Sequence, residues 1–283
     1  MHLPAALPHS RLLTRIQLWT VPLRANTEYD TLGMTFFQSW QSAIPQMFPA
    51  IGLTVALAFI AWAMRAVTIT AALTGIILTV TLCLAAGPAA LLPVVSVFLL
   101  TVITTRIGRR KKERLGTAER RHGRGAMQIL ANISVSAICA APLIFLPYAR
   151  HILLAGASAA LAEAAGDTVS SELGQAFGGN PRLITTGRRV TPGQDGGITM
   201  AGNFFALCAI VIVCAACQHA DLLLPQFYWT VLSAAWLGTF LDSLLGATLE
   251  RPARLGNNAV NFTSTAASAA IAIIILFAQQ HWR

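Results

Sequence analysis

Apolar segments long enough to cross a bilayer recur along most of this 283-residue chain. They consist mainly of Leu, Ala, Ile and Val, and about 20 such residues in helical form span the hydrocarbon core of a membrane. They lack the apolar-polar alternation of outer-membrane strands, which disfavours a β-barrel. We expect about eight spans, at residues 45–65, 67–87, 89–105, 126–148, 151–166, 198–218, 222–246 and 259–279.

The composition supports the same class of protein. Hydrophobic residues make up 55% of the chain and charged residues only 11%, whereas soluble domains carry about a quarter charged residues. The expected fold is therefore all-α, a polytopic transmembrane bundle forming one domain over residues 45–283. Residues 1–44 scatter arginines among apolar residues without the continuous apolar core of a signal peptide, and this pattern favours an N-terminal arm at the membrane interface.

Positive charge is concentrated in one connection between spans. The net charge is +9, and nine of the 20 basic residues lie between Arg106 and Arg124. This clustering reports membrane orientation rather than nucleic-acid binding, and the positive-inside rule places the loop 106–125 in the cytoplasm. Counting spans from there puts segments 167–197 and 247–258 on the same side. We therefore expect a multi-pass protein of the inner (cytoplasmic) membrane with its polar loops on one face.

The first of these loops combines cations with flexible backbone. Lys111 and Lys112 are the only lysines in the chain, and the four glycines of the loop, Gly108, Gly116, Gly123 and Gly125, could let it wrap a polyphosphate. Gln128 and Asn132 follow at helical spacing inside an apolar span, so each needs a partner on another helix or on a ligand. The alternative is a topogenic loop that binds lipid headgroups, which charge density alone favours.

The second loop gathers acids and hydroxyl groups. Asp167, Glu172 and Asp195 lie among serine, threonine and asparagine residues, and such oxygen atoms are ligands that Mg²⁺ prefers, usually shared with water and substrate phosphates. The alternative is an ordinary solvated loop. Glu163 lies one helical turn before Asp167, and two carboxylates on one face repel unless a metal or an arginine lies between them.

The third polar region joins the last two spans. Asp242 lies within an apolar helix, so we expect it to face the bundle interior and to have a cation or hydrogen-bond partner. Asn257 and Asn261, one turn apart, open the final span. Such a pair commonly joins helices, but opposite Asp242 it would contribute to the same pocket.

At these positions the chain resembles a known family. The runs KKERLG, GRGAMQILAN, DTVSSELG, GGNPRLITTGRRVTPGQDGG, LDSLLGATLE and NNAVNFTST are similar, in order and from about residue 67 onward, to the integral-membrane family that includes phytyl-phosphate kinase of tocopherol synthesis. The resemblance implies a membrane kinase that converts a prenyl monophosphate into the diphosphate with the γ-phosphate of CTP or another nucleoside triphosphate. This chain departs from the family at Gly125, because family members usually have an acidic residue after the Gly-Arg pair that corresponds to Gly123 and Arg124.

The polar residues of the three segments and the resemblance together suggest roles for individual residues. Asp167, Glu172 and Asp242 are expected to be catalytic, and these three with Asp195 are expected to bind Mg²⁺. The residues expected to bind nucleotide or lipid phosphate are Lys111, Lys112, Arg114, Arg124, Gln128, Asn132, Thr168, Ser171, Asn180, Arg182, Thr185, Thr186, Gly193, Gly196, Ser243, Gly246, Asn258 and Asn261.

Three other functions remain open from the sequence. A cytidylyltransferase would use the same CTP but leave a CMP-lipid. A transporter of phosphorylated lipid would also need a polar groove, although one that continues to the far leaflet. A scaffold would need none of the chemistry. The sequence leaves an oligomer possible.

Overall fold

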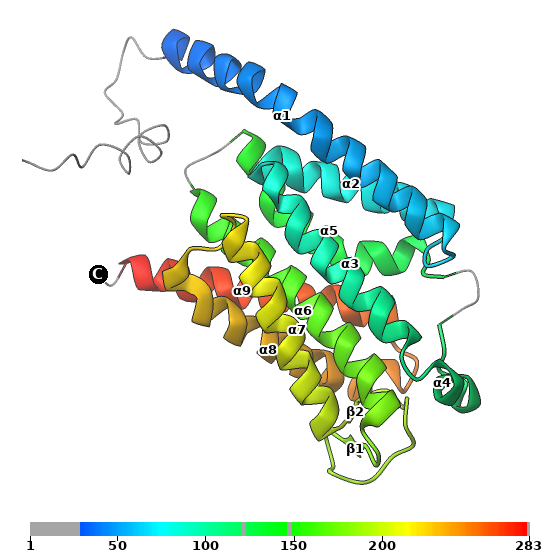
Figure 1. Cartoon of the computed structure of the whole chain (residues 1–283). Helices are drawn as coiled ribbons and strands as arrows, with labels where there is room; N and C mark the ends of the chain where they lie inside the picture. Colours follow the sequence, from blue (N-terminus) through cyan, green and yellow to red (C-terminus); the bar gives the residue numbers. More distant parts are fainter. Residues whose placement is uncertain (1–28, 120–122, 146–148, 282–283) are drawn as a thin grey trace, which may run out of the picture. The chain divides into compact units, whose positions relative to one another are not determined.

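The computed structural model describes residues 29–119, 123–145 and 149–281 (Figure 1). The chain divides into two units, Met1–Pro45 and Gln46–Arg283, which are considered separately. The arm predicted over residues 1–44 lies mostly outside the described residues, and its described part, residues 29–44, is helical and belongs to α1 (Tyr29–Ala63).

The second unit is a bundle of helices, as the apolar runs predict. Its further elements are α2 (Ile69–Ala86), α3 (Leu91–Arg106), α4 (Arg109–Leu115), α5 (Ala126–Ala140), α6 (Arg150–Phe177), β1 (Arg182–Leu183), β2 (Gly197–Ile198), α7 (Met200–His219), α8 (Tyr228–Leu245) and α9 (Asn257–His281). Three 3₁₀ turns, Pro88–Ala90, Ala141–Ile144 and Pro225–Phe227, and a π-helical turn, Gly246–Glu250, extend or precede these helices.

Seven helical stretches of the described residues are long and apolar enough to cross a membrane. The first predicted span, 45–65, corresponds to the shorter apolar stretch Met47–Ala63 of α1. The chain is therefore an all-α polytopic membrane protein, and the other seven predicted spans match the seven stretches with shifted ends.

The largest shift concerns α6, which the sequence analysis limits to residues 151–166. The helix instead continues for 28 residues to Phe177, and 83% of its apolar window is buried, against 33% to 44% for the other spans. Its small residues let neighbouring helices approach closely. A Cβ atom at Gly156 would lie 2.6 Å from Ile273 Cδ1, and one at Gly166 would lie 2.8 Å from Ile210 Cγ1.

The length of α6 corrects the second predicted loop. Asp167, Thr168, Ser171 and Glu172 lie on its last turns, so the loop begins only after Phe177. Hydropathy ends the span too early because these polar residues face a polar cavity inside the protein instead of lipid. Within the loop, β1 and β2 form a short antiparallel pair, with Arg182 opposite Ile198.

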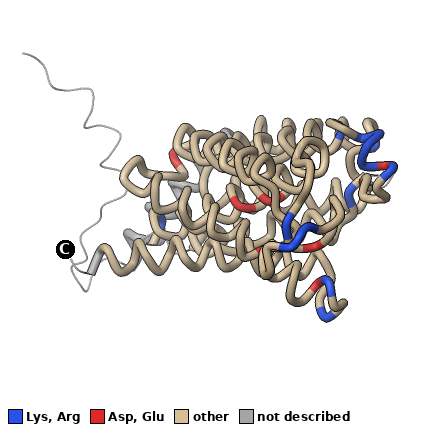
Figure 2. Tube along the Cα trace, turned by 90° about the horizontal axis from the view of Figure 1, so that it is seen from below, with Lys and Arg blue, Asp and Glu red and all other residues tan. Residues whose placement is uncertain are grey.

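The polar segments between the helices meet at one end of this unit, where most of the arginine and lysine residues gather (Figure 2). Glycines with positive φ make the contacts. A Cβ atom at Gly193 would lie 2.3 Å from Thr117 Cγ2, and one at Gly196 would lie 2.4 Å from Ala247 Cβ. The loop between β1 and β2 therefore packs against both other polar segments, as expected from the sequence.

Candidate functional site

A polar cavity of about 150 Å³ opens at this end of the bundle. Its walls come from the segment that precedes α5 and from α5, α6 and α9. The residues that line it are Glu119, Arg124, Gln128, Asn132, Asp167, Thr168, Ser171, Glu172, Gln175, Asn257 and Asn261.

Arg124 is fixed at the cavity by its backbone. Its N–H donates to the Ala66 carbonyl (3.0 Å) and its carbonyl accepts from the Thr68 N–H (3.0 Å), so the segment pairs with the turn between α1 and α2. Gly123, with φ +79°, allows this approach, since a Cβ atom there would lie 2.3 Å from the Ala66 carbonyl carbon. The loop before α5 is thereby held at the cavity mouth.

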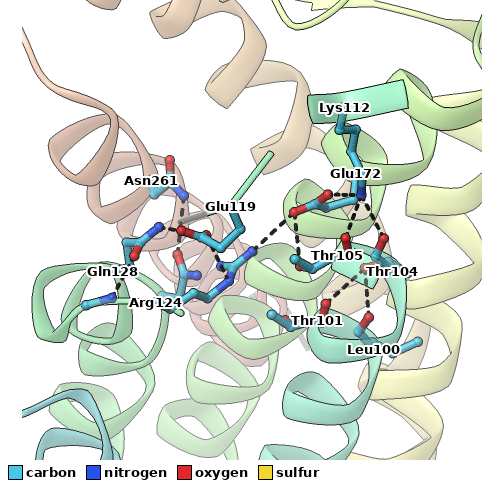
Figure 3. A network of polar contacts seen from close by, with 12 residues as sticks. Leu100, Thr101, Thr104, Thr105, Lys112, Glu119, Arg124, Gln128, Glu172 and Asn261 are labelled. Carbon is cyan, nitrogen blue, oxygen red and sulfur yellow. Dashed lines mark hydrogen bonds and ion pairs between the residues drawn. The ribbon is translucent and has the colours of Figure 1, made fainter. Parts of the chain in front are cut away.

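The guanidinium of Arg124 lies between two carboxylates (Figure 3). Its Nε is 3.7 Å from Glu119 Oε2 and its Nη2 is 3.8 Å from Glu172 Oε1. Both distances exceed hydrogen-bonding range, and the buried Nε has no hydrogen-bond partner among the residues that the structure describes. With 13% of its side chain exposed, Arg124 presents a positive charge with unused donors to the cavity.

Lys112 occupies a different place from the one predicted. Its side chain is 1% exposed, and its ammonium donates to the carbonyls of Thr104 (3.0 Å) and Thr105 (2.9 Å) and to Glu172. Glu172 also accepts from the Thr105 hydroxyl (3.0 Å). Because all three ammonium donors have protein acceptors, Lys112 joins α4 to the end of α3 and orients Glu172, which in turn lies beside Arg124.

The start of α5 adds a neutral amide. Gln128 Oε1 accepts from the Gly125 N–H (2.8 Å), and its Nε2 donates to Glu119 (3.2 Å). This arrangement caps the first turn of the helix, whose N–H groups otherwise lack intrahelical acceptors. It also explains why Gln128 is tolerated in an apolar span.

Three asparagines link α9 to α5. Asn257 Nδ2 donates to Asn261 Oδ1 (3.2 Å), and Asn261 Nδ2 donates to Asn132 Oδ1 (3.3 Å). Asn132 is 8% exposed, and its Nδ2 has no acceptor among the described residues. The chain of amides thus ends in an amide donor of Asn132, a residue that lines the cavity.

A group of carboxylates continues from the cavity into the bundle. Asp167 lines the cavity and lies within hydrogen-bonding reach of Asp242, and both act electrostatically on Glu163. Ser264 donates to Asp242 Oδ2 (2.9 Å). Glu163 is 1% exposed, and within the described part of the chain neither of its carboxylate oxygens has a hydrogen-bond partner. Asp242 faces the bundle interior, as the sequence predicts.

Asp195 lies apart from these carboxylates in the loop before β2. Its side chain is exposed, and the partial burial of its carboxyl group raises its pKa, although the nearby Arg251 acts in the opposite direction. Arg251 also lies 3.1 Å from the side-chain oxygen of Gln194 when that amide is oriented to accept. These contacts join the loop to the π-helical turn.

The structure therefore divides the residues predicted to form the site. It brings to the cavity wall Arg124, Gln128, Asn132, Asp167, Thr168, Ser171, Glu172 and Asn261. The other predicted residues do not line this cavity: Lys111, Lys112, Arg114, Asn180, Arg182, Thr185, Thr186, Gly193, Asp195, Gly196, Asp242, Ser243, Gly246 and Asn258.

Two cavity residues carry no sequence prediction. Glu119 is one of two acids in a strongly basic loop, where the many arginines and lysines around it draw attention away from a single carboxylate. Gln175 lies one turn beyond Ser171 on α6. Its helical spacing would identify it once the full length of α6 is known, but an α6 that ends at residue 166 excludes it.

The predicted four-carboxylate metal centre is not assembled as one cage. Among the described residues, no group of three or more His, Cys, Asp and Glu is arranged to hold a metal ion. Glu172 is engaged by Lys112, and neither Asp195 nor Asp242 lines the cavity. The donors that remain, Asp167 with neighbouring hydroxyl and amide oxygens, fit Mg²⁺ that keeps waters and binds phosphate oxygens.

Comparison with known proteins places the chain in a family. The model of the family "Integral membrane protein DUF92" matches residues 52–269. An uncharacterised membrane protein of Synechocystis sp. is 34% identical over 187 residues, which cover 64% of this chain and 72% of that protein. An uncharacterised membrane protein of Methanocaldococcus jannaschii is 32% identical over 187 residues, covering 65% and 75% respectively.

A plant protein is also similar. Protein VTE6 of Arabidopsis thaliana, chloroplastic, is 26% identical over 205 residues, which cover 69% of this chain and 61% of that protein. No solved structure matches the chain. Because the family match covers most of its length, the chain belongs to the DUF92 family of integral membrane proteins.

Proposed function

We propose that the protein is a membrane kinase that transfers the γ-phosphate of CTP or another nucleoside triphosphate to a prenyl monophosphate, giving the diphosphate. Two kinds of observation support this proposal. The motifs resemble the family that includes phytyl-phosphate kinase, and VTE6 is a relative. The structure adds a polar cavity, with a cation and a carboxylate on its wall, at the end of apolar helices.

The observation that carries the proposal is the unused hydrogen-bonding capacity of Arg124 beside Asp167. A guanidinium whose two carboxylate neighbours lie 3.7 and 3.8 Å away can bind phosphate oxygens through charge-assisted hydrogen bonds. Pockets that enclose a whole drug-sized ligand measure about 300–1,000 Å³. A cavity of about 150 Å³ suits phosphate groups, with the rest of each substrate outside.

The lining residues divide the work of phosphoryl transfer, which depends mainly on positioning and charge neutralisation. Arg124 would bind non-bridging oxygens, and the free amide donor of Asn132 would fix their orientation. Thr168 and Ser171 supply hydroxyl groups on the same helix as Asp167. Asp167 would hold Mg²⁺, which when bound neutralises charge on the phosphate oxygens.

The surface beside the cavity suits a lipid substrate. Met127, Leu130 and Phe262 are exposed apolar residues on α5 and α9, next to the cavity residues Gln128 and Asn261. A prenyl chain that follows these side chains would remain at membrane level while its phosphate enters the cavity. This placement favours a lipid phosphate over a soluble acceptor.

The proposal is tested with purified protein, Mg²⁺, a series of prenyl monophosphates and CTP or ATP labelled at either the γ- or the α-phosphate. We expect label from the γ-position in a lipid diphosphate. Label from the α-position would identify a cytidylyltransferase or related nucleotidyltransferase instead. If folded protein transfers label to none of the lipids, the proposed activity is wrong.

Variants connect the activity to the cavity. We expect Arg124→Gln to lower kcat/KM by about 10- to 100-fold, the effect of losing charged hydrogen bonds of roughly 1.5–3 kcal/mol, and Asp167→Asn to lower it while raising the Mg²⁺ concentration required. Arg254→Gln removes an exposed arginine from the loop before α9 and provides the control. If Arg124→Gln and Arg254→Gln were equally active, the cavity would not be the catalytic site.

A further inference from the structure

The basic loop between α3 and α5 presents its cations in two directions. Lys112 and Arg124 turn inward, as described above. The opposite face of α4 forms an open hollow of about 650 Å³ that is separate from the polar cavity. We call it the α4 basic surface, and its lining residues are Arg106, Gly108, Arg109, Arg110, Lys111, Glu113 and Arg114.

Most of this surface charge is not neutralised by the protein. Five cations face one acid, Glu113, which pairs with Arg109 (3.0 Å), so the surface carries four net positive charges. Lys111 donates to the carbonyl of Ala176 at the end of α6 (2.9 Å). Arg106, Arg110 and Arg114 are exposed and form no ion pair with the described residues.

The surface lies where a bilayer presents its headgroups. The span Pro88–Arg106 has 19 residues, about 28 Å at 1.5 Å per residue, close to the hydrocarbon thickness of about 30 Å. Arg106 therefore marks the membrane boundary, and α4 begins three residues later. Lys112 fixes α4 to the carbonyls of Thr104 and Thr105, which keeps its basic face at this level.

We propose that the α4 basic surface binds the headgroups of anionic phospholipids in the surrounding leaflet. Cations held beside the bilayer attract anionic lipids, and neutral hydrogen-bonding side chains, which characterise the polar cavity, do not line this surface. An open surface with charge but few directional donors suits mobile headgroups better than one oriented nucleotide. The loop thus serves two ligands, with phosphate transfer at its inner side and membrane lipid at its outer side.

The test compares lipid retention in native mass spectrometry after purification from mixed phosphatidylglycerol and phosphatidylcholine bilayers. The variant replaces Arg106, Arg110 and Arg114 with Gln. The matched control replaces the exposed residues Arg188, Arg189 and Arg254 with Gln, removing the same charge from other loops at this end. We expect the first variant to lose retained phosphatidylglycerol by on the order of tenfold, and the control to retain it.

Equal retention by the wild type and the α4 variant, or an equal loss in the control, would overturn the proposal. A second measurement uses only the wild-type protein in case the variant fails to fold. Spin-labelled phosphatidylglycerol should be immobilised more than spin-labelled phosphatidylcholine at low salt, and the difference should shrink as salt rises. No headgroup preference at low salt would also overturn it. Neither measurement requires nucleotide, so both are independent of the proposed kinase activity.

Discussion

At the scale of single residues, the ion pair between Lys112 and Glu172 fixes α4, the helix within the basic loop, against α6. A buried ammonium with three protein acceptors is stable only while each acceptor is present, and the same holds for its carboxylate partner. The pair therefore stabilises the position of α4 and places Glu172 beside Arg124.

Removing one member of this pair should cost more stability than removing both charges. We expect Lys112→Met to lower the free energy of unfolding by about 3–5 kcal/mol, because Glu172 loses its buried partner. Adding Glu172→Gln should recover part of that loss, since a neutral amide needs no cation. Chemical or thermal unfolding in detergent measures both effects. A double variant that is less stable than Lys112→Met would contradict this account.

The sequence predicts positive charge at residues 111 and 112, but it does not predict which side chain points into the protein. Lys111 and Lys112 are adjacent in the chain and share one predicted role, yet Lys111 is exposed and Lys112 is 1% exposed. Glu172, Thr104 and Thr105 decide the difference, and Glu172 lies 60 residues from Lys112 along the chain. Pairing over that separation cannot be read from local pattern.

At the scale of elements, the turns between helices depend on glycines that approach another segment. Gly196, with φ +73°, places its backbone against the π-helical turn, where an added Cβ would lie 2.4 Å from Ala247 Cβ and 2.7 Å from Ala247 N. Gly116 has nearly the same φ, +72°, but nothing lies within 4 Å of an added Cβ. Comparing substitutions at these two glycines therefore distinguishes the cost of backbone strain from the cost of steric overlap.

Alanine at these two glycines should therefore have different effects. We expect Gly116→Ala to destabilise the protein by about 1–2 kcal/mol through left-handed backbone strain alone. Gly196→Ala should add roughly 1–3 kcal/mol from overpacking and should loosen the loop before β2. Melting temperatures in one detergent compare them. Equal losses would mean that the contact between Gly196 and Ala247 contributes little.

The length of each apolar run predicts that a helix exists there, but it does not predict the residues at which the helix begins and ends. The predicted end of the fifth span at residue 166 is wrong because the polar residues that follow remain helical and face the cavity. Burial in a polar site removes the cost that polar residues would have against lipid. The same error hides Gln175, which becomes a cavity residue only when α6 reaches Phe177.

At the scale of the whole bundle, the loops that precede α5, α7 and α9 lie at one end, and the turn between α7 and α8 lies at the opposite end of α7. The positive-inside rule predicts that the end with the basic loop faces the cytoplasm. The three loops are therefore predicted to face the same side of the membrane, although they lie far apart in the sequence.

That orientation can be checked with a membrane-impermeant maleimide on intact and opened cells. In a chain whose five native cysteines are replaced by alanine, Arg110→Cys, Arg188→Cys and Arg254→Cys should react only once the cytoplasmic side is accessible. His219→Cys should react from outside. Labelling of the first three positions from different sides would contradict the common face, and labelling of all three from outside would reverse the orientation.

The sequence by itself determines the class of the protein and the end of the bundle at which its polar segments meet. Apolar runs require helices that satisfy their own backbone hydrogen bonds in lipid, and the order of spans carries the three polar segments to one end. The tertiary structure decides which polar residues meet. Arg124, Asp167 and Asn261 reach one cavity because close packing around the small residues of α6 brings α5 and α9 together, and contacts between distant segments turn Lys112 inward while leaving its neighbours at the surface.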